Sequence, residues 1–143
     1  MDTMTSLIQG ITPTNAVKFT VVGEPRSKQR PRVVRGRAYT PKETVAAEKA
    51  VAVAYRQASE HLFEHQVVVS IDFYNGNRRR RDIDNMAKLV MDALNGVAFV
   101  DDFQVVELNL RKFFTDKERA RTEVRLAEVV TWPGERETIP EVS

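Results

Sequence analysis

The sequence predicts a single α+β domain in which a mixed or antiparallel sheet of about four strands packs against two main helices. Its 143 residues suit one domain, and 42% of them are hydrophobic, which is enough for a core. Runs that alternate apolar and polar residues are interleaved with two runs of helical character. We assign residues 16–131 to the domain, residues 1–15 to a flexible N-terminal arm and residues 132–143 to a flexible acidic tail.

The first predicted strand covers residues 17–22, which alternate and then become apolar. A basic segment without acidic residues follows at positions 26–37, and Pro31 prevents it from being regular helix or central strand throughout. Residues 32–39 can form a small hairpin that turns at Arg35-Gly36. The basic side chains of the segment are Arg26, Lys28, Arg30, Arg32, Arg35 and Arg37.

The first helix is predicted over residues 40–59. Thr40 can cap it, Pro41 suits the first helical position, and Glu43 completes a capping box. The many alanines that follow give the segment high helix propensity.

A second strand is predicted over residues 66–74, where Asp72 lies on the face opposite to an apolar set. That apolar set consists of Val67, Val69, Ile71 and Phe73. A second helix is predicted over residues 84–94, with Asp84 at the cap position and Asn95-Gly96 as its stop. Its apolar stripe comprises Met86, Leu89, Val90, Ala93 and Leu94.

Two further strands are predicted near the C-terminus, over residues 103–114 and 121–130, joined by a polar turn at 115–119. Their sequence proximity suggests an antiparallel hairpin. The residues expected on the buried faces are Val106, Leu108 and Leu110 in the first run, and Thr122, Val124 and Leu126 in the second.

The composition indicates in which cellular environment the protein is expected to occur. It contains no cysteine, which excludes disulfides and thiolate metal sites. No apolar run approaches the ~18 residues that span a membrane, and the N-terminus does not resemble a signal peptide. We therefore expect a soluble protein of the cytoplasm without a membrane partner.

Charge is clustered along the chain although the net charge is only +2. The second basic block, Arg78, Arg79, Arg80 and Arg81, runs directly into Asp82 and Asp84, followed by Asn85. Clustered cations of this kind are typical of proteins that bind nucleic acid. A group of carboxylates attracts hard divalent cations that prefer oxygen ligands. The sequence therefore indicates a protein that brings phosphates to a metal.

A second acidic pair, Asp101 and Asp102, precedes a predicted strand. If the second helix packs on the sheet, we expect both acidic pairs to meet at one end of it. Lys88 lies one helical turn beyond Asp84 and can reach the same place. Mg²⁺ would relieve the repulsion between these carboxylates, and phosphodiester hydrolysis is the chemistry that this combination serves. Lys88 would stabilise negative charge in the transition state.

Each of these residues also has an ordinary structural explanation. Asp84 can be a helix cap, Asp101-Asp102 a turn, Lys88 a solvated side chain and the arginine run a surface patch. His61 and His65 have helical spacing without other ligand candidates nearby, so we interpret them as structural or surface residues. The combination of D-x-D-N, a lysine and four arginines is harder to explain in this way.

These residues resemble the RusA family of Holliday junction resolvases. The resemblance rests on Arg78 to Lys88, on Asp92-Ala93-Leu94 and on Asp101 to Val106, and the segment from Gly23 to Arg32 resembles the basic segment of phage and prophage members. It extends from Val17 to about Val130. The two ends of the chain lie outside it.

The resemblance implies a homodimeric, Mg²⁺-dependent endonuclease that makes paired nicks in opposing strands of a four-way DNA junction. Mn²⁺ is expected to substitute, no small-molecule cofactor is expected, and the protein would act in the cytoplasm of a bacterium or a phage-infected cell. By motif, the catalytic and metal-binding carboxylates are Asp82, Asp84 and Asp102, with Asp101 as a further metal candidate. Lys88 matches the functional lysine, and Asn85 supports the site. Phosphate contacts would come from Arg26, Lys28, Arg30, Arg32, Arg78, Arg79, Arg80 and Arg81.

Two other functions are compatible with the same residues. One is a less selective nuclease that also cuts flaps, forks and three-way junctions. The other is a non-catalytic, structure-specific DNA-binding protein whose acids balance its arginines. Loss of cleavage with retained binding in Asp82→Asn would distinguish a nuclease from a binding module.

Overall fold

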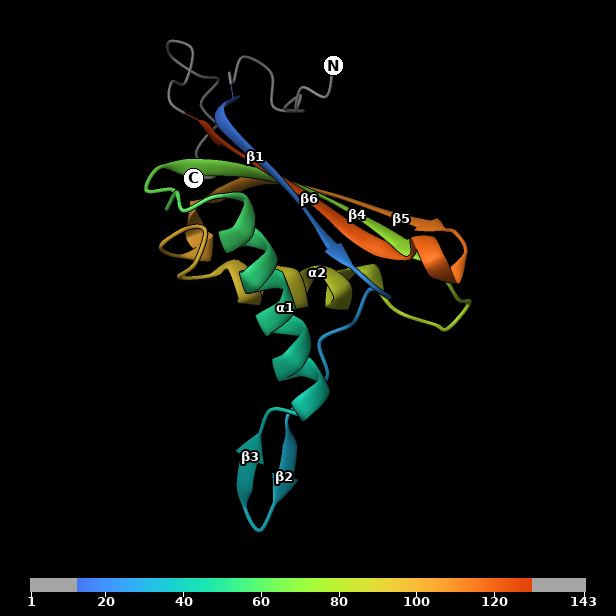
Figure 1. Cartoon of the computed structure of the whole chain (residues 1–143). Coiled ribbons are helices and arrows are strands. Elements are labelled where there is room, and N and C mark those ends of the chain that lie inside the picture. Colours follow the sequence, from blue (N-terminus) through green and yellow to red (C-terminus); the bar gives the residue numbers. More distant parts are fainter. Residues whose placement is uncertain (1–12, 130–143) are drawn as a thin grey trace, which may run out of the picture.

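Two helices cover one face of a four-stranded sheet, and a small two-stranded hairpin projects away from this body (Figure 1). The computed structural model describes residues 13–129. In chain order the elements are β1 (Pro13–Val22), β2 (Arg32–Val34), β3 (Arg37–Tyr39), α1 (Lys42–Ala58), β4 (Gln66–Asn75), α2 (Ile83–Leu94), the 3-10 helix η1 (Asp102–Gln104), β5 (Val105–Phe114), the 3-10 helix η2 (Lys117–Arg119) and β6 (Arg121–Val129). The α+β prediction is confirmed.

The core lies between the sheet and the helices, and β4 and α2 supply much of it. The predicted inward residues of β4 are all buried, with Val67, Val69 and Ile71 at 0% exposure. The predicted stripe of α2 is buried as well, from Met86 to Leu94. Gly96, with φ +78°, follows the helix at the predicted stop. Periodicity therefore identified both elements and their buried faces correctly.

The first predicted boundaries were less accurate. Strand β1 begins at Pro13, so it includes residues assigned above to the N-terminal arm. The rest of that arm, the acidic tail and Val130 lie outside the described residues. Helix α1 begins at Lys42 with Pro41 as its N-cap and makes no side-chain cap hydrogen bond, so the predicted capping box of Thr40 and Glu43 is wrong. Instead, the backbone carbonyl of Pro41 accepts from the N–H groups of Thr44 and Val45.

The predicted hairpin of the last two strands is also wrong. The sheet order is β1-β6-β4-β5, so β4 lies between β5 and β6. Strand β5 pairs with β4 in parallel, whereas β6 pairs antiparallel with both β4 and β1. The segment between β5 and β6 therefore crosses the end of β4 instead of making a tight turn. Strand β4, α2 and β5 form a β-α-β unit, in which a helix returns the chain to the starting end of the sheet.

Strand β5 is an edge strand, and its predicted buried face is only partly covered. Leu108 is 42% exposed, whereas Leu110 packs against the main core. The pairing with β4 shifts after Val67↔Val105, so that Val68 lies opposite Glu107. The extra residue, Val106, contacts Val68 on the other side of the sheet. A bulge exchanges the two faces of a strand, and simple alternation in the sequence does not reveal it.

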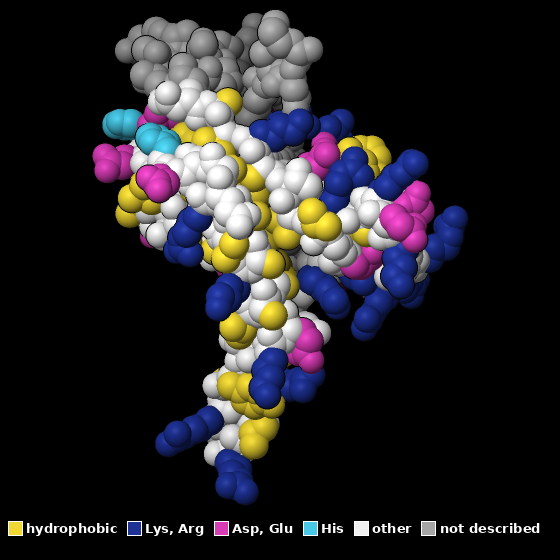
Figure 2. Space-filling model, viewed as in Figure 1, with side chains coloured by type: hydrophobic (Ala, Val, Ile, Leu, Met, Phe, Trp, Pro, Cys, Tyr) yellow, Lys and Arg dark blue, Asp and Glu magenta, His cyan; other side chains and the backbone are white. Residues whose placement is uncertain are grey.

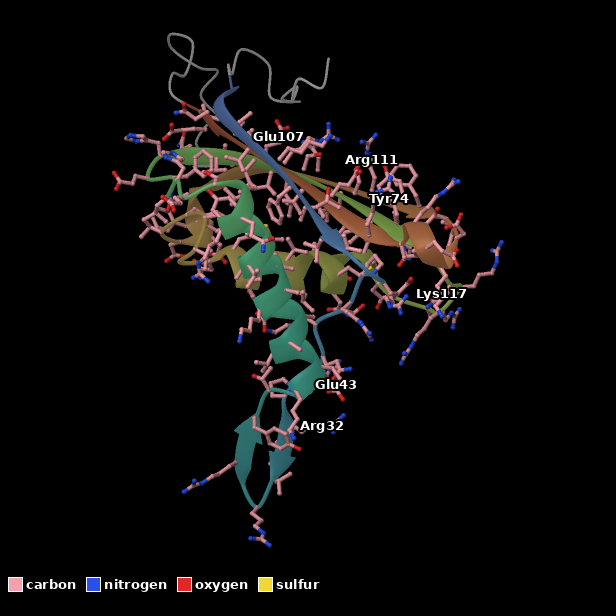
Figure 3. All side chains as sticks on the ribbon, viewed as in Figure 1. Arg32, Glu43, Tyr74, Glu107, Arg111 and Lys117 are labelled. Atoms are coloured by element: carbon pink, nitrogen blue, oxygen red, sulfur yellow. The ribbon has the colours of Figure 1, made fainter. Side chains whose placement is uncertain are left out.

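The face of the sheet opposite to the helices carries charge and aromatic rings. Figure 3 shows Arg111 and Tyr74 on this face. Asp72, 3% exposed, accepts two hydrogen bonds of 2.9 Å from Arg111 and one of 3.2 Å from Arg125. Tyr74 stacks on Phe113 with ring centroids 5.0 Å apart. The arginines satisfy the buried carboxylate, so Asp72 contributes to the sheet and is not available to a ligand.

Gly76 allows the crossing between β5 and β6. A Cβ atom at this position would lie 2.9 Å from both the backbone oxygen of Asp116 and the Cα atom of Lys117. Thr115 donates from its backbone to the carbonyl of Asn75 at 2.8 Å, which holds the crossing segment against the end of β4. Both close neighbours are backbone atoms, so a side chain here can be accommodated only by moving the crossing segment.

We expect Gly76→Ala to lower the free energy of unfolding by about 1–3 kcal/mol, because the new methyl group overpacks against backbone. Urea unfolding measures this change. Without the close contact, the same substitution would raise the free energy of unfolding by about 0.4–1 kcal/mol, because alanine lowers the conformational entropy of the unfolded chain. An unchanged or increased stability would therefore contradict this account of the crossing.

Candidate functional site

The D-x-D-N segment lies where the chain passes from β4 into α2. Asp82 is the N-cap residue by backbone position, yet its side chain makes no cap hydrogen bond. Asp84 lies in the first turn of α2 and accepts from the N–H group of Asn85 at 2.9 Å. The interpretation of Asp84 as the helix cap is therefore wrong. Both carboxylates are exposed beside the positive end of the helix dipole, where negative charge is stabilised.

Asp82 borders an open hollow whose other lining groups are polar or cationic. Besides Asp82, it is lined by Ser27, Arg80, Arg81, Asn85 and Lys112. The hydroxyl of Ser27 is buried without a hydrogen-bond partner among the described residues. The hollow therefore places cationic groups and an unsatisfied hydroxyl around one carboxylate, which suits a phosphate-containing ligand.

Lys88 and Asp92 continue from Asp84 along one side of α2 at intervals of four residues. The ammonium group of Lys88 lies 3.5 Å from the carboxylate of Asp92. The side chain of Lys88 is 61% exposed, so this pair is a weak constraint and the ammonium group stays accessible.

Asp101 and Asp102 have different local roles. Asp101 is the N-cap of η1 and forms a capping box with Gln104. Gln104 in turn donates to the carbonyls of Phe63 and His65, at 2.9 and 2.8 Å. Asp101 thus anchors the start of β5, whereas Asp102 is exposed and lies close enough to α2 to feel the charges of Asp92 and Lys88.

The pKa of Asp102 is raised above the usual range of an aspartate. The main cause is a hydrogen bond shared with the carboxyl of Asp101, to which desolvation and the negative charges of Asp101 and Asp92 add. Lys88 acts in the opposite direction. Such crowding of negative charge is relieved by a proton or by a cation.

The structure separates the two acidic pairs that the sequence was expected to bring together. Asp82 follows the final end of β4, whereas Asp101 and Asp102 precede the beginning of β5. Because β4 and β5 run in parallel, these positions lie at opposite ends of α2 (Figure 1). Asp84 and Asp92 are separated by about 12 Å along the helix axis at 1.5 Å per residue. The expectation that both pairs meet at one end of the sheet within one chain is therefore wrong.

Among residues 13–129, no group of three or more acidic or histidine side chains is positioned to hold a metal ion. His61 and His65 illustrate this. The ring of His61 packs edge-on against Phe63 at 4.5 Å, and the carbonyl of His65 accepts from Gln104. The ring contact of His61 and the exposure of both residues agree with their interpretation as structural or surface residues.

Lys28 connects the basic segment to both helices. Its N–H group donates to the carbonyl of Asn85 at 3.0 Å, and its ammonium group lies 3.1 Å from Glu48 and 3.2 Å from Asp92. Burial opposes the charged form, but these two carboxylates outweigh it and raise the pKa of Lys28. Predicted as a phosphate contact, Lys28 instead has two carboxylate partners and a side chain that is 23% exposed.

In the run from Arg78 to Arg81, Arg81 is held in an ion pair within the fold, whereas the other three arginines are exposed. The side chain of Arg81, 8% exposed, pairs with Glu24 at 3.1 Å, and Lys112 donates to the carbonyl of Arg81 at 2.7 Å. Glu24 also accepts from the N–H group of Gly76. These contacts fix the loop that leads into α2. Arg79 and Arg80 are exposed, and Arg78 lies over the ring of Phe114 at 5.4 Å from its centroid.

The sequence interpretation missed Glu24 and Lys112 as supports of this loop. Glu24 is separated from Arg81 by 57 positions and Lys112 by 31, so no local pattern connects them. The only sequence signal for such a role was the position of Glu24, a single acidic residue directly before the basic segment.

We expect Asp101→Asn to lower the pKa of Asp102 in the metal-free protein. The substitution removes the negative charge that disfavours the Asp102 carboxylate, and it provides an amide that can donate to that carboxylate. Asparagine also remains a good N-cap, so η1 should persist. Titration of the side-chain carboxyl carbon by NMR measures the pKa, and an unchanged or raised value would contradict the proposed contact.

Comparison with known proteins gives one consistent result. A family model described as "Endodeoxyribonuclease RusA" matches residues 22–127. The chain is 31% identical over 117 residues to the crossover junction endodeoxyribonuclease RusA of Escherichia coli strain K12, and this covers 80% of the chain and 97% of the relative. It is 30% identical over 137 residues to the uncharacterized protein YqaN of Bacillus subtilis strain 168, covering 78% of the chain and 96% of the relative.

Proposed function

We propose that this chain, which belongs to the endodeoxyribonuclease RusA family, resolves Holliday junctions by paired nicks in opposing strands. The family membership assigns the enzyme class, endodeoxyribonuclease. The observation that carries the proposal is the family match over residues 22–127, which contains the whole D-x-D-N segment, Lys88 and both members of the second acidic pair. Similarity to the Escherichia coli crossover junction enzyme supports branched DNA as the substrate.

Mg²⁺ is the proposed cofactor, with Mn²⁺ able to replace it. The proposed ligands are Asp82, Asp84 and Asp102, and Asp101 is a less favoured candidate because its side chain already caps η1. The chemistry of the donor set fits the metal, since all three groups are exposed carboxylates and Mg²⁺ prefers oxygen ligands. When bound, Mg²⁺ polarises the phosphoryl group and lowers the pKa of a coordinated water.

The other residues of the site act on the DNA phosphates and on the position of the carboxylates. Lys88 offers an accessible ammonium group, so we propose that it stabilises negative charge developing on the phosphate. Asn85 joins Asp84 and the basic segment through its backbone N–H and carbonyl groups. The proposed phosphate contacts are Arg26, Arg30, Arg32, Arg78, Arg79 and Arg80, all of which are exposed.

The proposed homodimer accounts for the separation of the acidic pairs. Within one chain the pairs lie at opposite ends of α2, and twofold symmetry can bring opposite ends of two copies together. Asp82 and Asp84 of one copy would then share a site with Asp102 of the other copy. Two such sites per dimer would serve the two opposing strands that must be nicked.

We expect Asp82→Asn to abolish cleavage of a synthetic four-way junction while leaving binding intact, because the carboxylate is lost but the arginines remain. Cleavage with Mg²⁺ or EDTA, beside linear duplex and a fork, measures activity and selectivity. Asp116→Asn is the matched control, since Asp116 is an exposed cap of η2 and asparagine can cap there as well. Equal cleavage of forks would favour a general branched-DNA nuclease, and unchanged cleavage by Asp82→Asn would overturn the site.

A shared site predicts that activity returns when Asp82→Asn and Asp102→Asn proteins are mixed and allowed to exchange subunits. Each mixed dimer would hold one site with both substitutions and one with neither, so about a quarter of all sites would be intact. Single-strand nicking of the junction measures the recovery. Mixing Asp82→Asn with Asp84→Asn is the control, because these residues belong to the same end of α2 and no intact site can form. No recovery in the first mixture would indicate that each site lies within one chain.

A further inference from the structure

The β2–β3 hairpin projects from the body of the protein without burying any of its residues. Every residue from Pro31 to Thr40 is exposed, and Val33 and Val34 reach 70% and 51% exposure. Figure 1 shows the hairpin projecting beyond the first turn of α1, away from the sheet. A two-stranded hairpin in water is at best marginally stable, and this one has three residues in each strand. Exposed apolar side chains on such an element point to a binding partner.

The turn fixes the geometry of the hairpin. Arg35 and Gly36, its two central residues, both have positive φ, at 51° and 77°. Positive φ at both positions matches the twist of the flanking strands and favours a tight two-residue hairpin. The side chain of Arg35 is consequently held at the tip of the projection.

The pairing register gives the hairpin two different faces. Val33 pairs with Ala38, and these two residues form a small apolar face. The pairs on either side of them point the other way. This second face, here called the arginine face, consists of Arg32, Tyr39, Val34 and Arg37.

The chemistry of the arginine face matches DNA. Its two arginines lie diagonally across the strands, Arg32 opposite Tyr39 and Arg37 opposite Val34, and no acidic residue occurs from Arg26 to Arg37. Figure 2 shows basic side chains at the outer end of the hairpin with apolar surface between them and the body. Arginines bind phosphates, while apolar groups contact sugars and base edges. The major groove of B-DNA is wide enough for a two-stranded ribbon.

The base of the hairpin is tied to the candidate site. Lys28 binds the carbonyl of Asn85 and the carboxylates of Glu48 and Asp92, and the N–H group of Gln29 donates to the hydroxyl of Thr44 at 3.4 Å. The segment that leads into the hairpin is therefore held against α2 at Lys28 and against α1 at Gln29, and the hairpin extends outward from the first turn of α1. A DNA arm seated on the hairpin would be held at a fixed distance from the carboxylates.

We propose that the β2–β3 hairpin enters a groove of one arm of the branched DNA with its arginine face, and that Arg35 binds a phosphate at its tip. This inference rests on the proposed function and adds to it a second contact region, separate from the run of arginines from Arg78 to Arg81 that leads into α2. It explains why an exposed element without a core of its own carries both apolar and cationic side chains.

The test measures binding of a four-way junction in EDTA, so that no strand is cut, over a series of salt concentrations. Arg35→Asn/Arg37→Gln removes two cations and retains a residue that tolerates positive φ in the turn. Two lost phosphate contacts should reduce the slope of log affinity against log salt by about 1.8. The control is Lys49→Ala/Arg56→Ala, which removes two exposed cations from α1 and should leave the slope unchanged.

A pair of valines tests the assignment of the faces. Val34→Gln changes the arginine face, whereas Val33→Gln changes the opposite face of the same strand. We expect weaker junction binding by Val34→Gln only. Neither residue is buried, so both variants should fold, which thermal unfolding would verify. Equal effects of the two changes would overturn groove binding through the arginine face.

The length of the junction arms distinguishes a specific contact of the hairpin with duplex DNA from non-specific electrostatic attraction between the protein and the DNA. Junction arms are shortened from about two helical turns to about half a turn, at about 10.5 base pairs per turn. The wild type should lose affinity once the hairpin has no duplex to contact, and Arg35→Asn/Arg37→Gln should lose little more. If the double variant binds every junction as the wild type does, or changes the oligomeric state in sedimentation instead of DNA binding, the hairpin inference fails. A wild type that cleaves junctions in that case leaves the proposed function standing, whereas a wild type that neither binds nor cleaves them overturns both.

Discussion

The parallel pairing of β4 and β5 is the constraint on which the rest of the structure depends. Parallel neighbours cannot be joined by a tight turn, so α2 must return the chain to the starting end of the sheet. That return buries the apolar stripe of α2 and leaves one acidic pair at each end of the helix. It also places β5 at the sheet edge, from which the chain must cross β4 to begin β6. The close approach at Gly76 is a direct consequence of this crossing.

The basic residues divide into those that hold the structure together and those that are available to a polyanion. Lys28 and Arg81 each have carboxylate partners and little exposed surface. They join segments distant in sequence, and a lost partner would leave a partly desolvated charge. Arg79, Arg80 and the arginines of the hairpin are exposed. Counting cations in the sequence overestimates the number that can contact phosphates, because ion pairing within the fold is not visible there.

The hairpin and the run from Arg78 to Arg81 lie on different parts of the molecule, and the segments next to each of them contact α2 or the loop that leads into it. The backbone N–H of Lys28 binds the carbonyl of Asn85, and its ammonium group binds the carboxylate of Asp92. The side chain of Lys28 therefore extends along α2. Glu24 fixes the loop at the other side by binding Gly76 and Arg81. This arrangement suits an enzyme that recognises the shape of a branched substrate, because phosphate contacts position DNA without reading its sequence.

Local patterns in the sequence were sufficient for the secondary structure of the core. Alternation identified β4 and β6, a helical stripe identified α2, and an Arg-Gly turn identified the hairpin. These signals depend on a few neighbouring residues, so they survive without tertiary information. The predictions were wrong where adjacent residues could occupy the same structural position, or where an irregularity interrupted a strand. Thr40 had the right residue type for a cap, but the helix begins two residues later, and the bulge at Val106 reversed the alternation of β5.

The sequence by itself determined the fold class, the buried faces of β4 and α2, the family and the residue types of the site. Only the tertiary structure decided which strands are neighbours and therefore where the carboxylates lie relative to one another. Asp84 and Asp102 were assigned to one site from the sequence, yet they are associated with different ends of α2 because β5 pairs in parallel with β4. Strand pairing is a long-range property, set by which apolar faces can be buried together, and residue spacing alone does not contain it.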